Sequence, residues 1–232
     1  MFTNITPMRL SRAFAVLAVL AGTFLSSAAH AQLTVYLVRH GQTDWNKDGR
    51  IQGGTNNPLN STGHEQAAAM AKTLADVKVD TVYVSSHLRA QQTAAVFEGR
   101  APIVAMDMLR ERFFGKFEGA DDKDTAIVAD WNKRRFAWAD DMDGGETLEK
   151  QSARTQTALR QIIERHKNGG TVVIVGHGGI NPLIASHLLG VPPQDGASAI
   201  NQANDEIYRI EVGKNDSASI WKLVPRNKLS EL

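Results

Sequence analysis

Two short apolar segments, each ending at a histidine and a glycine, constrain the fold of this chain most. The first runs from Thr34 to Val38 and is followed by Arg39-His40-Gly41. The second runs from Thr171 to Val175 and is followed by Gly176-His177-Gly178-Gly179. Uninterrupted apolar runs rich in β-branched residues predict buried strands. Because ligands of open α/β sheets bind at the carboxyl ends of strands, we expect His40 and His177 to share one pocket.

The rest of the chain alternates between predicted strands and predicted helices. Thr62-Gly63-His64-Glu65 is typical of a capping box, and Ser85 or Ser86 is expected to cap the next helix. This alternation predicts an α/β fold, a three-layer α/β/α sandwich around a largely parallel, mixed sheet. The further strands are expected at 81–85, 103–105, 206–212 and 219–224, and the helices at 62–75, 87–97, 147–166 and 181–189.

Residues 1–31 have the pattern of a cleavable signal peptide. Arg9 and Arg12 precede a short apolar segment, residues 13–25, and an A-x-A pattern ends at Ala31. The apolar segment falls short of the about 20 residues that a membrane span needs. We therefore predict cleavage after Ala31 and export to the periplasm or the medium, with no stable membrane insertion afterwards. An uncleaved anchor is the alternative.

Residues 32–232 are expected to form one domain. This length suffices for a single hydrophobic core. Acidic and basic residues nearly balance, with a formal net charge of +1 for the whole chain and no long basic tract, which argues against nucleic acid as a partner. The sequence contains no cysteine and therefore no disulfide. No sequence pattern indicates the oligomeric state.

Two arginines and two histidines lie next to predicted strand ends: Arg39, His40, Arg89 and His177. Arginine does not ligate metals, so this group makes a poor metal site, but guanidinium groups match phosphate oxygens bidentately. Arg89 also falls in the first turn of a predicted helix, which favours an anion. Arg39, Arg89 and a protonated His177 would balance the charge of a phosphoryl group in transfer.

His40 is the candidate nucleophile, attacking phosphorus through one ring nitrogen while a hydrogen bond holds the other. The alcohol that leaves needs a proton, so a carboxylic acid should lie nearby. Glu111 is our choice, although reasoning from the residues alone leaves Asp107 and Glu118 open.

The segment Arg39-His40-Gly41-Gln42-Thr43-Asp44-Trp45-Asn46 resembles the R-H-G-x-T-x-W-N signature of the histidine phosphatase superfamily, in its phosphoglycerate-mutase-like branch, branch 1. Four further motifs match in the same order and span nearly the whole of residues 32–232. They are Ser85-Ser86-His87-Leu88-Arg89-Ala90-Gln91-Gln92-Thr93-Ala94, Leu109-Arg110-Glu111, Gly144-Gly145-Glu146-Thr147 and Val175-Gly176-His177-Gly178-Gly179.

The resemblance implies a phosphohistidine at His40, with Glu111 as general acid and then as base. It implies that Arg39, Arg89 and His177 bind the phosphoryl group, and that no metal or other cofactor is required. The remaining residues expected at the same pocket are Thr43, Asn46, Gln52 and Gly178, of which the first three are equally typical of loop-shaping turns. One departure is Asn56, where the family often has aspartate.

The choice between phosphatase and mutase rests on a few positions. Glu111-Arg112-Phe113-Phe114-Gly115 resembles the mutase pattern E-R-H-Y-G, and Trp131-Asn132-Lys133-Arg134-Arg135 is similar to a mutase segment that grips a carboxylate. Against this, Gln52 is typical of phosphatase members, and an exported mutase would lack its metabolites. We expect a phosphomonoesterase of histidine acid phosphatase type that acts on a small phosphorylated substrate. Mutase activity is the alternative, and a non-catalytic phosphoester-binding protein is the third possibility.

The cluster Lys133-Arg134-Arg135 has two interpretations. Ile127, Trp131 and Trp138 recur at helical spacing, which favours an amphipathic helix with a basic outer face. The sharper hypothesis is a cap over the pocket that selects acidic phosphomonoesters. The remaining histidines are expected to be plain helix residues: His64, His87, His166 and His187.

Overall fold

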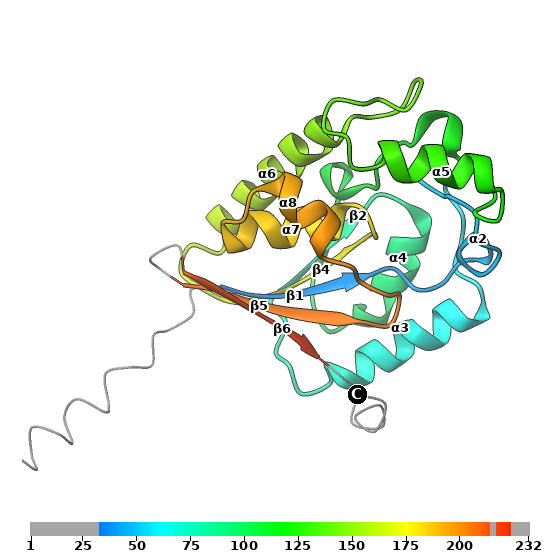
Figure 1. Ribbon diagram of the computed structural model, residues 1–232. Coiled ribbons are helices and arrows are strands. Elements are labelled where there is room, and N and C mark those ends of the chain that lie inside the picture. The colour runs from blue at the N-terminus through cyan, green and yellow to red at the C-terminus, as the bar shows by residue number, and fades with distance from the viewer. Residues whose placement is uncertain (1–32, 214–216, 224–232) are drawn as a thin grey trace, which may run out of the picture. The chain divides into compact units, whose positions relative to one another are not determined.

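The computed structural model describes residues 33–213 and 217–223 of the chain (Figure 1). Within this part, six strands form one sheet in the order β3-β2-β4-β1-β5-β6. Strands β1, β2, β3 and β4 run parallel, while β5 is antiparallel to both β1 and β6. The strands are β1 (Leu33–Arg39), β2 (Thr81–Ser85), β3 (Ile103–Met106), β4 (Thr171–Gly176), β5 (Ile207–Val212) and β6 (Ala218–Leu223).

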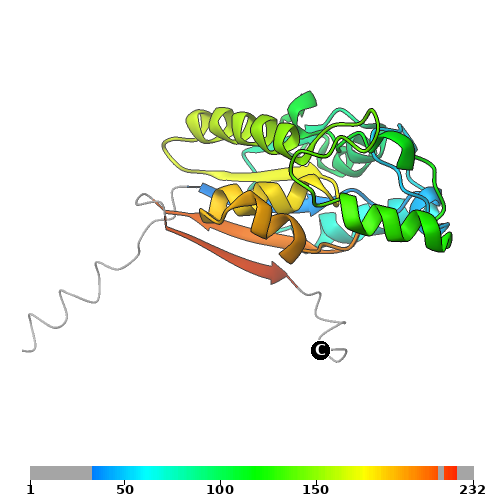
Figure 2. The ribbon, with the colours of Figure 1, turned by 45° about the horizontal axis from the view of Figure 1, so that its top comes forward.

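Helices cover both faces of the sheet (Figure 1 and Figure 2). Alternate residues of β1 point to opposite faces, so Val35 and Leu37 pack against α6 and α7, while Tyr36 and Val38 pack against α3 and α4. The predicted three-layer α/β/α fold with a mixed sheet is confirmed. The helices are α2 (Asp44–Lys47), α3 (Ser61–Thr73), α4 (Leu88–Ala94), α5 (Thr125–Arg134), α6 (Leu148–Arg165), α7 (Ile180–Leu189) and α8 (Pro193–Ala199), and a 3₁₀ turn at Ala95–Phe97 continues α4.

The predicted strands and long helices agree with the structure to within one or two residues, but two predicted caps are wrong. Helix α3 starts at Ser61, because the side chain of Asn60 accepts the N–H of Gly63 and ends the loop before Thr62 is reached. Helix α4 has no side-chain cap at His87 among the described residues, and the carboxamide oxygen of Asn56 accepts the N–H of Leu88 instead.

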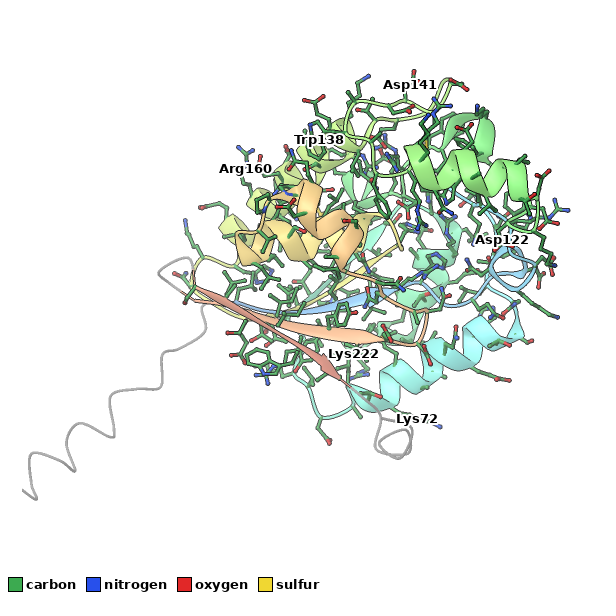
Figure 3. The ribbon with its side chains drawn as sticks, in the orientation of Figure 1. Lys72, Asp122, Trp138, Asp141, Arg160 and Lys222 are labelled. Carbon is green, nitrogen blue, oxygen red and sulfur yellow. The ribbon has the colours of Figure 1, made fainter. Side chains whose placement is uncertain are left out.

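Two helices, α2 and α8, were not predicted from the sequence, whereas the amphipathic helix suggested by Ile127, Trp131 and Trp138 forms as α5 but ends at Arg134. Helix α2 lies between β1 and the helix that was predicted to start at residue 62. The side chains of Asp140 and Asp143 bind Arg134, so the chain turns directly after α5. Figure 3 shows Trp138 and Asp141 in the connection between α5 and α6.

The predicted signal peptide, residues 1–31, lies outside the described residues. In the part that is described, none of the helices has both the length and the hydrophobicity that crossing a bilayer requires. The boundary between signal peptide and domain therefore stays a prediction.

Candidate active site

A pocket of about 470 Å³ lies where β1 and β4 end. Two strand ends, the loop before α3, the start of α4 and the segment after β3 contribute to its inner part. Helix α5 lies at the same end of the described domain (Figure 1), and α5 and α8 contribute to the outer part. The charged, polar and glycine residues that line this inner part are Arg39, His40, Asn46, Gln52, Gly53, Arg89, Glu111, Gln151, Gly178 and Gly179.

His40 follows the last residue of β1 and is buried. Its Nδ1 lies 2.7 Å from the carbonyl oxygen of Gly41. A carbonyl oxygen only accepts, so Nδ1 carries the proton and Nε2 keeps its lone pair. Burial, together with the charges of Arg89 and Arg39, holds the pKa of His40 well below its usual range. The ring is therefore neutral at pH 7 and has the tautomer that a nucleophile needs.

His177 lies beside His40, with ring centroids 5.1 Å apart. Its Nε2 is 2.7 Å from the hydroxyl oxygen of Ser85, which also accepts the N–H of His87. In the tautomer in which Ser85 donates to Nε2, the proton of His177 lies on Nδ1, which is buried with no hydrogen-bond partner in the described part of the chain. Burial and the charge of Arg89 hold the pKa of His177 well below its usual range, so the free site does not contain the protonated His177 that the sequence led us to expect.

Arg39 and Arg89 bring two positive charges to the pocket, and Arg89 is fully buried while Arg39 is half-buried. Arg39 Nη1 donates to the carbonyl of Gln202 at 2.8 Å, and the Nη atoms of Arg89 donate to the carbonyls of Thr55 and Gly53. Each Nε is buried without a hydrogen-bond partner in the described part of the chain. Burial lowers the pKa of Arg89 to about 10, so it stays charged at neutral pH. Two guanidinium groups whose buried Nε atoms lack a partner favour an anion here.

Glu111 is buried and its carboxylate accepts three N–H groups. Oε1 accepts from the backbone of Arg112 and from Nε2 of Gln151, both at 2.9 Å, and Oε2 accepts from the backbone of Gly179 at 2.7 Å. Oε1 thus accepts two of these bonds and Oε2 accepts one. These three hydrogen bonds fix the carboxyl group at the pocket wall.

The two other carboxylates that the sequence left open are used differently. Glu118 accepts the N–H groups of Gly54 and Phe114 and so shapes the loop, and burial raises its pKa. Asp107 is exposed and pairs with Arg110. Neither lines the pocket in the described structure, whereas Glu111 does.

Two glycines let charged groups approach the turn after β4. A Cβ on Gly178 would lie 3.2 Å from the guanidinium carbon of Arg39, and a Cβ on Gly179 would lie 2.6 Å from Oε1 of Glu111. Any side chain at residue 179 would displace the carboxyl group. The observed position of the Glu111 carboxyl group therefore depends on glycine at residue 179, whereas a Cβ at residue 178 would need only a small shift of Arg39.

The three polar loop residues expected at the pocket, Thr43, Asn46 and Gln52, have two different positions. Thr43 is fully buried and forms a capping box with Asn46 at the start of α2, so it shapes the turn and does not line the pocket. Asn46 and Gln52 line the pocket.

The three residues of the basic cluster 133–135 make different contacts. The guanidinium of Arg134 is bound to Asp140 and Asp143, while Lys133 is exposed and away from the pocket lining. Arg135 lines the pocket, with its guanidinium carbon 4.7 Å from the ring centroid of Phe136. Of the three residues in the hypothetical cap, Lys133, Arg134 and Arg135, only Arg135 lines the pocket.

Sequence reasoning missed several residues at the site. His87 is buried with its ring centroid 5.0 Å from that of His177, so it is no plain helix residue. Gln151 is a polar residue on the buried face of α6, and this mismatch was the signal that could have found it. Arg50 and Phe136 of the outer pocket were missed as well, whereas Arg112 and Trp131, which also line it, belong to the two segments similar to mutases.

His166 and His187 have structural contacts. His166 lies 3.0 Å from the hydroxyl of Tyr83, and His187 lies 3.0 Å from the hydroxyl of Ser152. Across residues 33–213 and 217–223, no three histidine, aspartate or glutamate side chains are grouped as metal ligands would be. The donor set of the pocket, with two guanidinium groups, suits a phosphoryl group better than a cation.

Comparison with known families agrees with this geometry. A family model described as the histidine phosphatase superfamily, branch 1, matches residues 35–222. The histidine acid phosphatases, expected above as the type, form a different branch, and the match does not support that narrower description.

Individual relatives include both phosphatases and a mutase-like protein. Phosphoglycerate mutase-like protein 4 of Arabidopsis thaliana is 34% identical, over 81% of this chain and 84% of its own length. The metal-independent phosphoserine phosphatase of the same plant is 35% identical, over 63% of this chain and 64% of its own length. The solved α-ribazole phosphatase of Shigella flexneri is 26% identical, with a TM-score of 0.72, and the match covers 84% of this chain and 97% of that one.

Proposed function

The chain belongs to branch 1 of the histidine phosphatase superfamily, and on that premise we propose that it hydrolyses phosphomonoesters through a phosphohistidine on His40. One observation carries the proposal. The unprotonated Nε2 of a neutral, buried histidine shares a pocket with two guanidinium groups, from the half-buried Arg39 and the buried Arg89, and with a buried carboxyl group, from Glu111.

In the first step, Nε2 of His40 attacks the phosphorus atom of the bound ester. An N–P bond forms while the bond between phosphorus and the ester oxygen breaks, and Glu111 donates a proton to the departing alcohol. The free N–H groups of Arg39, Arg89 and His177 stabilise the charge on the three equatorial oxygens.

In the second step, water replaces the alcohol. Its oxygen attacks the phosphohistidine while Glu111 accepts a proton, and the N–P electron pair returns to His40 Nε2 as phosphate leaves. The hydrogen bond from His40 Nδ1 to Gly41 keeps the ring in one orientation through both steps.

We place the activity with the phosphatases, and we keep phosphoryl transfer between positions of glycerate as the second candidate. Gln52, typical of phosphatase members, lines the pocket, and two of the relatives above are phosphatases. The mutase-like relative and the positively charged outer pocket support the second candidate.

The outer pocket favours an acidic substrate. Nε and Nη1 of Arg112 are buried and have no hydrogen-bond partner in the described structure, and Arg135 and Arg50 line the same space. Burial lowers the pKa of Arg112 to about 10, so it remains a cation at pH 7. A carboxylate or a second phosphate on the alcohol would pair with these groups.

Two further parts of the proposal concern metal dependence and the location of the enzyme. We propose that turnover needs no metal, because guanidinium and imidazole groups supply the charge and hydrogen bonds a metal would provide, and one relative is a metal-independent phosphatase. We also propose that residues 1–31 direct export and that the mature enzyme acts outside the cytoplasm.

The experiment is phosphate release from a panel of phosphomonoesters, with and without a chelator. We expect release that is unchanged by chelator and abolished in H40A. H64A is the matched control, because His64 is an exposed residue of α3. Absence of release from every monoester would support a binding protein, and transfer between the 2- and 3-positions of glycerate faster than release would support the mutase.

A further inference from the structure

Gln151 is a buried polar residue that the proposed phosphoryl chemistry does not use. It belongs to α6, its side chain is 0% exposed, and it lines the pocket next to Glu111. Its neighbours on the buried face of the helix include Leu148, Leu159 and Ile162. A glutamine in such a position loses hydration, so both ends of its carboxamide need partners.

Only one end of the carboxamide has a protein partner. Nε2 donates to Oε1 of Glu111 at 2.9 Å. Because a carboxylate oxygen accepts, the amide orientation that places Nε2 there is the favoured one. Oε1 of Gln151 is then left buried, with no donor within reach anywhere in residues 33–213 or 217–223. The pocket is the remaining source of a donor.

We infer that Oε1 of Gln151 accepts a hydrogen bond from a hydroxyl group on the alcohol part of the substrate. This rests on the proposed function, in which Glu111 protonates the ester oxygen. Since Gln151 is hydrogen-bonded to that same carboxyl group, the hydroxyl belongs on a carbon next to the one that carries the ester. The substrate class is thereby narrowed to phosphomonoesters with a vicinal hydroxyl, and Gln151 is a specificity-determining residue.

The test compares two ligands that differ by this hydroxyl alone. 3-Phosphoglycerate has it at carbon 2, and 3-phosphooxypropanoate has hydrogen there while keeping the phosphate and the carboxylate. Binding is measured calorimetrically in the H40A background, where no turnover occurs. We expect H40A to bind 3-phosphoglycerate about five- to tenfold more tightly than the deoxy analogue, the effect of one hydrogen bond to a buried acceptor.

Three second-site variants identify the acceptor. In H40A/Q151L the preference disappears because 3-phosphoglycerate binds more weakly, while binding of the deoxy analogue stays within about twofold. H40A/Q151E keeps an acceptor oxygen but loses the N–H donated to Glu111, so it keeps the preference. H40A/Q156L is the control, because Gln156 lies on the exposed face of α6 and bonds Arg160.

Equal affinity of H40A for the two ligands, or a preference that survives Q151L, would overturn the inference and would mean that Oε1 binds only water. Circular dichroism of each variant excludes unfolding as the cause of a lost preference. Phosphate release by the wild-type protein is scored separately. A protein that binds 3-phosphoglycerate with this preference but hydrolyses nothing would contradict the proposed function and leave Gln151 as the specificity residue.

Discussion

At the scale of single residues, the arrangement of charge around His40 determines what the site can do. Burial and the guanidinium groups of Arg89 and Arg39 all disfavour a protonated imidazole, and the Gly41 carbonyl selects the tautomer. The same arginines that would bind a phosphoryl group therefore keep the attacking nitrogen unprotonated.

This arrangement predicts the titration of His40. An NMR titration of the His40 ring should show a midpoint well below 6.5, and the acid limb of kcat/KM should lie below pH 6.5 as well. R39M removes one nearby positive charge and should move the midpoint upward, toward 6.5. A wild-type midpoint near 6.5 would contradict the electrostatic account of the site.

Replacing Arg89 should lower activity by more than the loss of its charge alone would, because its side chain also binds the loop at Gly53 and Thr55. R89M should lower kcat/KM by about 10²- to 10³-fold, the usual effect of removing one transition-state donor. R100M provides the comparison, since Arg100 is an exposed arginine near α3. A loss of less than about threefold in R89M would place the phosphoryl group elsewhere.

At the scale of elements, two neighbouring arginines at the end of α5 have different roles. Arg134 binds Asp140 and Asp143 and fixes the end of the helix, while Arg135 lines the pocket. R135A should raise KM for 3-phosphoglycerate about tenfold relative to KM for neutral ethyl phosphate, because a charged hydrogen bond is lost. R134A should lower the melting temperature and leave that KM ratio unchanged. An unchanged ratio in R135A would remove the outer anion site.

Much of the arrangement of strands and helices around the site could be predicted from the sequence. The apolar runs before His40 and His177 are recognisable in the sequence, and parallel pairing of β1 with β4 brings their ends together. The cap of α4 could not be predicted, because Asn56 lies 32 residues before Leu88 and its contact depends on the tertiary fold. For the same reason His87 was predicted to be a plain helix residue, because its contact with His177 joins residues that are far apart in the sequence. Gln151 needed the structure to show what its carboxamide contacts.

At the scale of the whole molecule, buried neutral histidines link stability to pH. Burial, with the charge of Arg89, lowers the pKa of His87 to about 4, and the pKa values of His40, His177 and His187 are lowered as well. Between pH 6.5 and 4 the unfolded chain binds a proton at His87 that the folded protein binds only at the lower end. Stability from this group is therefore complete above pH 6.5 and decreases as the pH falls to 4.

The melting temperature should accordingly fall from pH 6.5 to pH 4 in differential scanning calorimetry. H87F keeps an aromatic ring against His177 but cannot titrate, so its melting temperature should fall less over the same range. H64F is the matched control, because His64 is exposed. Parallel curves for H87F and the wild-type protein would show that His87 does not take part in this linkage.

The most direct test of the account is to trap the phosphorylated enzyme. The protein is mixed with a phosphomonoester that it turns over, quenched in alkali to preserve phosphohistidine, digested and sequenced by mass spectrometry. We predict a single phosphorylated histidine, at His40, which appears before phosphate is released and is absent from H40A but present in H64A. Phosphate release with no phosphorylated histidine at any time, or with the phosphoryl group on another residue, would contradict the central claim that Nε2 of His40 attacks phosphorus.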